Sequence, residues 1–200
     1  MDLSTHQQFL SEFDPSAQLR VLKKLEDRYR YPVGFRVCET PLFMSDEFHG
    51  HLQQACDEII SQLQTSEFRS HAATAIPRGF EVAGEDSHPS FLQIDFGLCE
   101  DKHGNLIPQL VELQGFASVF CWQTALDRIL HEEGLVPGGW SCYYHQTSNE
   151  YISSLRDLIV RDANPENVIV LEIEPDAQRT NIDFACTEAF LKIRTVCLTN

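Results

Sequence analysis

The sequence predicts an α/β fold, built from an antiparallel hairpin and a parallel βαβ unit with flanking helices. Residues 92–98 alternate apolar and polar side chains, which is the period-2 pattern of a strand with one buried face. Residues 168–173, VIVLEI, form a nearly continuous apolar run, typical of a strand buried on both faces of a parallel sheet. Between these segments, apolar residues recur at helical spacing.

Two helices and a long loop are expected before the hairpin. Leucines at helical spacing predict a helix over residues 16–29, and Pro32 ends it. Ser45 or Asp46 is expected to cap a second helix that runs to about residue 64. Residues 65–89 are rich in Gly, Pro and small polar side chains. They predict a long surface excursion, which is either a substrate-facing lid or simply mobile.

The segments after the hairpin complete the predicted fold. Helical apolar patterns cover residues 117–133 and 149–161. The strand at 168–173 is followed by a predicted helix at 182–191 and a short apolar strand at 194–198. Strand, helix and strand within about thirty residues indicate a βαβ unit, whose two strands run parallel.

The sequence divides into three regions that we expect to pack as one compact unit. Residues 1–89 form an N-terminal helical region with the long loop, residues 90–146 hold the hairpin and its following helix, and residues 147–200 hold the βαβ segment. Because a parallel sheet of two strands is small, we also expect neighbouring strands, either from earlier segments or from further chain beyond residue 200.

The alternation predicts which hairpin side chains share a face. A turn centred on residues 103–104 places Ile94 opposite Leu113 and Phe96 opposite Val111, which gives a coherent apolar face. A slip by one residue would send these side chains to the wrong face.

The opposite face of the hairpin then carries two carboxylates side by side. Asp95 falls opposite Glu112, and Gln93 falls opposite Gln114. Cross-strand carboxylates about 5 Å apart repel by roughly 3 kcal/mol at an effective dielectric near 20. An offsetting cation, a shared proton or solvent must relieve that repulsion. Mg²⁺ prefers carboxylate and amide oxygens, and Gln114 supplies an amide, so one hypothesis is a metal site. The alternative is a longer turn with solvated carboxylates.

A second group of polar side chains follows the predicted strand at 168–173. Ligands of parallel sheets bind beyond the carboxyl ends of the strands. This rule places Glu174, Asp176, Gln178 and Arg179 near a ligand.

Composition excludes several classes of partner. The net charge of −15 argues against nucleic acid or an anionic membrane surface. No apolar run reaches the length of a membrane span, and the N-terminus lacks the basic and apolar regions of a signal peptide. Seven cysteines without a CxxC pair predict reduced thiols and a cytoplasmic protein.

The segments QIDFGL and PQLVELQ, followed by a helix, resemble the metal-binding hairpin of the circularly permuted ATP-grasp enzymes, the glutathionylspermidine synthase-like family. The resemblance implies that Asp95, Glu112 and Gln114 hold metal. It also implies that Gln93 stands where the family has an arginine that meets the ATP phosphate. Mg²⁺ and ATP are the implied cofactors. Residues 168–191 look like the Rossmann-like (pre-ATP-grasp) substrate domain of these proteins, with Glu174, Asp176 and Arg179 facing the ligand.

The resemblance implies the N-terminal portion of an ATP-dependent carboxylate–amine ligase, which acts through an acyl-phosphate on a small-molecule or peptide-like substrate. The lysines and glycine-rich loop that cover ATP would follow residue 200, so we expect no turnover from these 200 residues alone. An alternative is a non-catalytic binding module, which Gln93 favours and the retained Asp95–Glu112 pair opposes. A third is a free-standing domain that dimerises through its sheet edge. The expected partners are a second copy or the missing C-terminal ATP-grasp domain.

Overall fold

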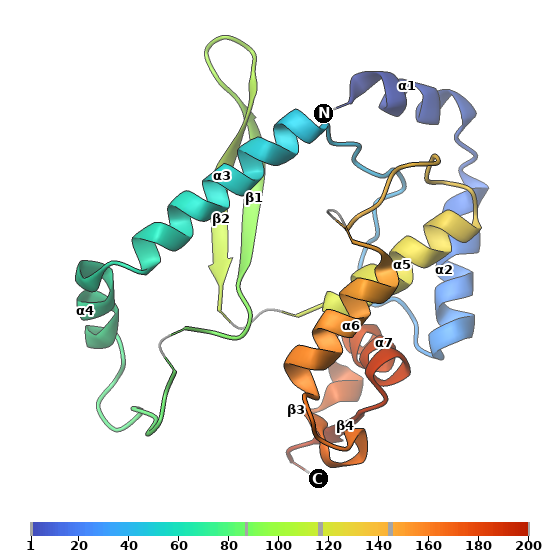
Figure 1. The fold of residues 1–200 in the computed structure, drawn as a ribbon. Helices are drawn as coiled ribbons and strands as arrows, with labels where there is room; N and C mark the ends of the chain where they lie inside the picture. Colours follow the sequence, from blue (N-terminus) through green and yellow to red (C-terminus); the bar gives the residue numbers. More distant parts are fainter. Residues whose placement is uncertain (1, 87, 116–117, 144–145, 200) are drawn as a thin grey trace. The chain divides into compact units, whose positions relative to one another are not determined.

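The computed structural model describes residues 2–86, 88–115, 118–143 and 146–199 (Figure 1). The chain is mixed α/β, with a two-stranded antiparallel sheet and a separate parallel strand pair. None of the described helices has the length and apolarity needed to cross a bilayer.

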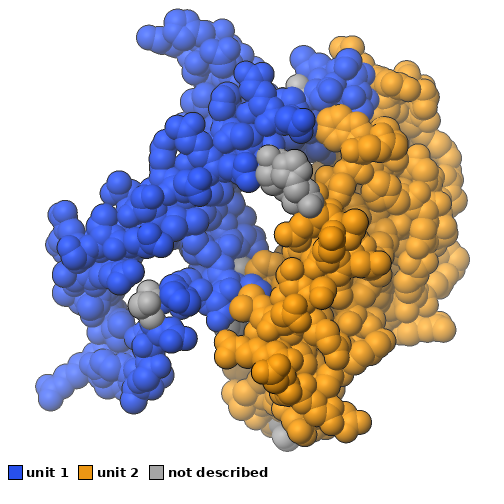
Figure 2. Space-filling model, viewed as in Figure 1, with its two compact units in different colours: residues 1–6, 42–117 blue, residues 7–41, 118–200 orange. Residues whose placement is uncertain are grey.

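The chain forms two compact units, coloured separately in Figure 2. Unit 1 comprises residues 1–6 and 42–117, and unit 2 comprises residues 7–41 and 118–200. These boundaries differ from the three regions delimited at residues 89 and 146 on the sequence. Helix α1, Leu3–Glu12, spans the first boundary and has no counterpart among the predicted elements.

Unit 1 is built from the predicted hairpin and the helices that precede it. Its elements are α3 (Asp46–Leu63), α4 (Ser66–Thr74), β1 (Gln93–Glu100) and β2 (Leu106–Gln114). The Ser45 side chain accepts a hydrogen bond from the Phe48 backbone N–H, so the predicted helix cap is confirmed. Helix α3 packs against β2. The hairpin is antiparallel, as predicted.

Unit 1 buries little of its surface. Among its described residues only Phe43 and Phe48 are buried. Every described residue of 64–90 is exposed, which agrees with the predicted surface excursion. Helix α4 lies within that stretch and was not predicted; the Thr65 side chain caps its N-terminus.

Unit 2 contains the remaining predicted elements. They are α2 (Ser16–Tyr29), α5 (Phe120–Glu132), α6 (Ser148–Ile159), β3 (Ile169–Glu172), α7 (Asn181–Leu191) and β4 (Arg194–Cys197), with short 3₁₀ turns η1 (Pro165–Asn167) and η2 (Pro175–Ala177). Strands β3 and β4 pair in parallel, which confirms the predicted βαβ unit. Helix α5 begins three residues later than predicted, and Ala117, its expected first residue, lies outside the described residues.

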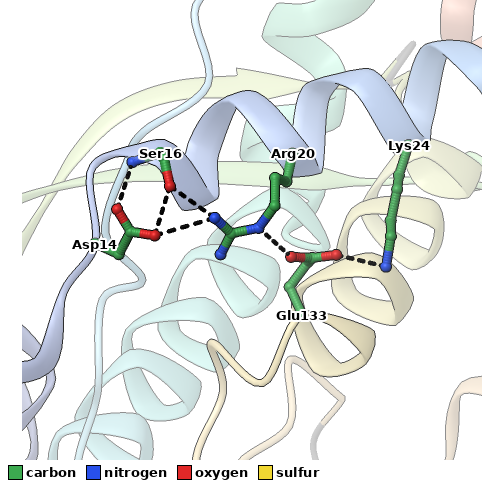
Figure 3. A network of polar contacts seen from close by, with 5 residues as sticks. All are labelled: Asp14, Ser16, Arg20, Lys24 and Glu133. Atoms are coloured by element: carbon green, nitrogen blue, oxygen red, sulfur yellow. Dashed lines mark hydrogen bonds and ion pairs between the residues drawn. The ribbon is translucent and has the colours of Figure 1, made fainter.

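The core of unit 2 lies where α7 and α2 pack against α5. Side chains from all three helices are at most 3% exposed there: Ala17, Val21, Leu25, Cys121, Ala125, Ile129, Ile182, Cys186 and Leu191. At the edge of this core, Glu133 accepts hydrogen bonds from Arg20 at 2.9 Å and from Lys24, and Arg20 also reaches Asp14 and Ser16 (Figure 3). The Glu133 carboxylate thereby ties α2 to the end of α5.

The prediction that residues 168–173 are buried on both faces is wrong. Ile169, Leu171 and Ile173 are 41%, 54% and 53% exposed, whereas the intervening Val170 and Glu172 are half-buried. The reason is that the described sheet has only two strands and is covered on one face. A continuous apolar run therefore leaves alternate side chains exposed.

Candidate functional site

The carboxylate face of the hairpin is formed as the sequence predicts. Asp95 pairs with Glu112, and Gln93 pairs with Gln114 on the adjacent antiparallel strand. Partner residues across an antiparallel ladder project to the same face, so both carboxyl groups and both amides share one surface.

The predicted pairing of Phe96 with Val111 is wrong, because Phe96 pairs with Leu110. The turn comprises residues 101–105, closed by a hydrogen bond from the Asp101 N–H to the Asn105 carbonyl. A loop with an odd number of residues moves the register by one position relative to the predicted turn. A β-bulge then follows, with Val111 as the extra residue, and it restores the predicted register at Asp95.

The bulge decides which residue lies beside Asp95. Without it the turn register would place Val111 opposite Asp95, and Glu112 would fall one position further along. Val111 instead lies on the carboxylate side of the hairpin. A Cβ atom built on Gly97, which shares that side with Asp95, would lie 3.4 Å from the Cγ2 atom of Val111. Val111 is 70% exposed there.

Two amide groups hold the Asp95 side chain. The Gln93 side-chain NH₂ donates to Oδ1 at 3.0 Å, and the Gln114 NH₂ donates to Oδ2 at 2.9 Å. Asp95 is half-buried, whereas Glu112 is exposed. The amides therefore orient Asp95 and direct their own carbonyl oxygens away from it. Gln114 contacts Asp95 through its nitrogen, and its oxygen is the atom that a metal would use.

The residues present offer a partial set of ligands for a hard cation. Two carboxylates and two amide oxygens suit Mg²⁺ chemically. In the part of the chain that the structure describes, however, no three His, Cys, Asp or Glu side chains are grouped to hold a metal ion. Any cation held by Asp95 and Glu112 would thus take most of its ligands from water or from a bound phosphate.

The second candidate site lies beyond the carboxyl end of β3. Glu174 adopts a left-handed conformation, with φ of 48°, and leads into η2. The Tyr31 hydroxyl donates to Asp176 at 2.9 Å, and this hydrogen bond raises the pKa of Tyr31. A cavity of about 250 Å³ opens beside them, and its polar lining comprises Tyr31, Asp176, Asn181, Glu188, Thr195 and Cys197. No lysine or arginine is among the described residues that line it.

The predicted residues of this loop do not all meet at the cavity. Asp176 lines it, whereas Glu174, Gln178 and Arg179 do not. The Gln178 side chain donates to the carbonyl of Ile173, the residue that precedes the loop, at 3.1 Å. Arg179 is exposed and forms no ion pair with the described residues. Its carbonyl oxygen lies so near Gly34 that an added Cβ would come within 2.6 Å.

Sequence reasoning missed a buried acidic residue, Asp183. Its carboxylate accepts hydrogen bonds from the backbone N–H groups of Val119 at 3.1 Å and Trp122 at 2.8 Å, which caps the start of α5. Asp183 is 7% exposed, and burial raises its pKa. Val119 has φ of 62°, an unfavourable conformation for a β-branched residue. The available signal was an acidic residue, one of two, inside the largely apolar segment IDFACTEAFL.

The hairpin residues belong to unit 1 and the 174–179 loop to unit 2, so each forms a candidate site by itself. Comparisons with models of known protein families, with curated proteins and with solved structures found no match.

Proposed function

We propose that the hairpin of unit 1 is the metal-holding element of an ATP-grasp-like carboxylate–amine ligase, of which this chain is the N-terminal portion. The observation that carries the proposal is the pairing of Asp95 with Glu112 on one face of the hairpin. A β-bulge produces that pairing, although like charges directly opposite each other are unfavourable in a sheet. A cation would remove the repulsion.

In this proposal Asp95 and Glu112 hold Mg²⁺, and Gln114 adds an amide oxygen after its side chain turns. When bound, Mg²⁺ neutralises phosphate charge during acyl-phosphate formation. Gln93 keeps the Asp95 carboxylate oriented through its hydrogen bond, while the hydrogen bond from Gln114 orients it only until the Gln114 side chain turns toward the metal. Gln93 can offer ATP phosphate only a neutral amide, so the remaining charge of ATP must be met by other cations.

The loop of residues 174–179 is the proposed substrate-facing part of unit 2. Asp176 is fixed by Tyr31 beside the 250 Å³ cavity, so its second carboxylate oxygen is available to a ligand. Glu174 and Arg179 are exposed on the same loop and would contact a substrate, or ATP, that extends beyond the cavity.

Calorimetric titration with Mn²⁺ and Mg²⁺ tests the proposal. Glu112→Gln removes one ligand without breaking any described hydrogen bond, and Asp95→Asn removes the other. We expect each variant to weaken metal binding at least tenfold. Glu100→Gln, at the turn end of the same hairpin, is the matched control and should bind within twofold of the wild type. Equal heats for all four proteins would contradict the metal role of the pair.

The second candidate function is a non-catalytic interaction module. The observation that favours it is that both oxygens of Asp95 already accept amide hydrogen bonds, which orient the carboxylate without a metal. Negligible metal binding by the wild-type chain, with and without an ATP analogue, would favour this function over the first.

A further inference from the structure

Unit 1 carries an open groove of about 700 Å³ between α3 and the hairpin. Its apolar lining comes from Ala55 and Ile59 of α3 and from Phe96, Pro108 and Leu110 of the strands. Leu110 is 52% exposed. Helix α3 therefore covers only part of the apolar face of this two-stranded sheet.

The apolar face of this two-stranded hairpin is unusually exposed. A two-stranded hairpin is marginal in water unless a helix or further strands cover its apolar face. Leu98 and Leu113 of the hairpin are 39% and 37% exposed, in addition to Leu110. Only two described side chains of unit 1 are buried. Little else in the unit therefore covers the apolar face of the hairpin.

The charge of unit 1 indicates what could cover it. Residues 1–6 and 42–117 contain thirteen Asp and Glu residues but only three Lys and Arg residues. No carboxylate among the described residues of this unit forms an ion pair, since the ion pairs of the described chain all lie in unit 2. Asp57 and Glu58 of α3 line the groove itself.

We propose that this groove binds a basic segment of another polypeptide, with apolar side chains on the floor and Lys or Arg against the acidic rim. Leu110, Phe96 and Ile59 would contact the apolar side chains, and Asp57 and Glu58 would pair with the cations. Charge complementarity selects this occupant, because the same acidic rim repels an anionic lipid surface and an acidic partner. A second copy of this acidic chain would bring like charges together.

The test uses the full chain and a fluorescein-labelled synthetic helix of leucine and lysine at helical spacing. Binding is followed by fluorescence anisotropy. Leu110→Ser should weaken binding at least fivefold. Val111→Ser is the matched control, because Val111 is 70% exposed on the opposite side of the hairpin, and it should change binding less than twofold.

The acidic rim is tested by a second pair of variants, which do not disturb packing. Asp57→Asn should weaken binding about threefold, while Glu85→Gln, which removes an exposed charge outside the groove, should have little effect. A leucine–glutamate helix should not bind. Circular dichroism establishes that each variant is folded.

Three results would overturn the proposal. One is that the basic helix does not bind at a protein concentration of about 100 µM, which is about ten times the Kd of ~10 µM of a weak interface. Another is that the groove variants and the control variants weaken binding of the basic helix equally, which would mean that the helix is attracted by the overall negative charge and not by the groove. The last is a wild-type dimer that Leu110→Ser converts to monomer, which would show that a second copy covers the groove.

Discussion

Replacing Asp183 by alanine should destabilise unit 2 strongly, because this one carboxylate satisfies two backbone N–H groups at the start of α5. A hydrogen bond to a charged group contributes about 1.5–3 kcal/mol. Two such bonds give a gross contribution of roughly 3–6 kcal/mol, and burial of the carboxylate, which raises its pKa, offsets part of it. We therefore expect a net loss of about 3 kcal/mol, larger than the roughly 1 kcal/mol typical of an exposed helix cap.

Urea unfolding measures this loss. Asp157→Ala is the matched control, since Asp157 is an exposed aspartate within α6 and its removal should change the free energy of unfolding by less than about 0.5 kcal/mol. A loss of about 3 kcal/mol corresponds to a fall in Tm of roughly 10 °C for a domain of this size. If the two variants unfold at the same urea concentration, the capping role assigned to Asp183 is wrong.

The same residue predicts a pH dependence. Because burial raises the pKa of Asp183 above its unfolded value of 3.8, the folded protein holds this proton more tightly than the unfolded chain. Its contribution to stability is therefore greatest below the unfolded pKa and falls as pH rises through the raised pKa. Asp183→Asn should flatten that part of the stability profile, measured by urea midpoints between pH 4 and 7. An unchanged profile would contradict the assignment.

Three further predictions concern unit 2. Hydrogen bonds from Lys24 and Arg20 lower the pKa of Glu133. Glu133→Gln should therefore be less stable than the wild type at pH 7, and this difference should vanish as pH falls through the lowered pKa. Urea midpoints at pH 7 and 3 check this. Gly34→Ala should cost about 1–3 kcal/mol because its Cβ meets a backbone carbonyl, whereas Gly138→Ala, with open space around it, should cost less in the same assay. Val119→Gly should leave the Tm unchanged or raise it, because glycine adopts positive φ without the roughly 1 kcal/mol of strain.

The sequence predicted the hairpin better than its turn. Alternation of apolar and polar side chains identifies the two faces, and it placed Asp95 beside Glu112 correctly. Alternation carries no information on a single inserted residue, so the five-residue turn and the bulge at Val111 could not be predicted separately. Their two one-residue shifts cancel at Asp95, which is why the carboxylate pair was right although Phe96 was paired wrongly.

Local sequence patterns could not predict those parts of the candidate sites that are formed by residues far apart in the sequence. Tyr31 and Asp176 are separated by 145 positions, and neither is marked by its neighbours as the partner of the other. Helix α4 was missed because SEFRSHAAT has no apolar stripe and buries no side chain, so only its Thr65 cap distinguishes it from a loop. The βαβ unit was predictable because strand, helix and strand follow one another directly.

The interruption of unit 2 by unit 1 has a consequence for folding. Helices α2 and α5 pack together although residues 42–117, a segment of about 76 residues, lie between the two parts of unit 2. Closing a flexible loop of that length costs roughly 4 kcal/mol. If residues 42–117 become compact first, the ends to be joined are already closer and the closure is faster. A substitution that loosens the hairpin would then slow the assembly of the distant helical core while leaving every native contact in that core in place.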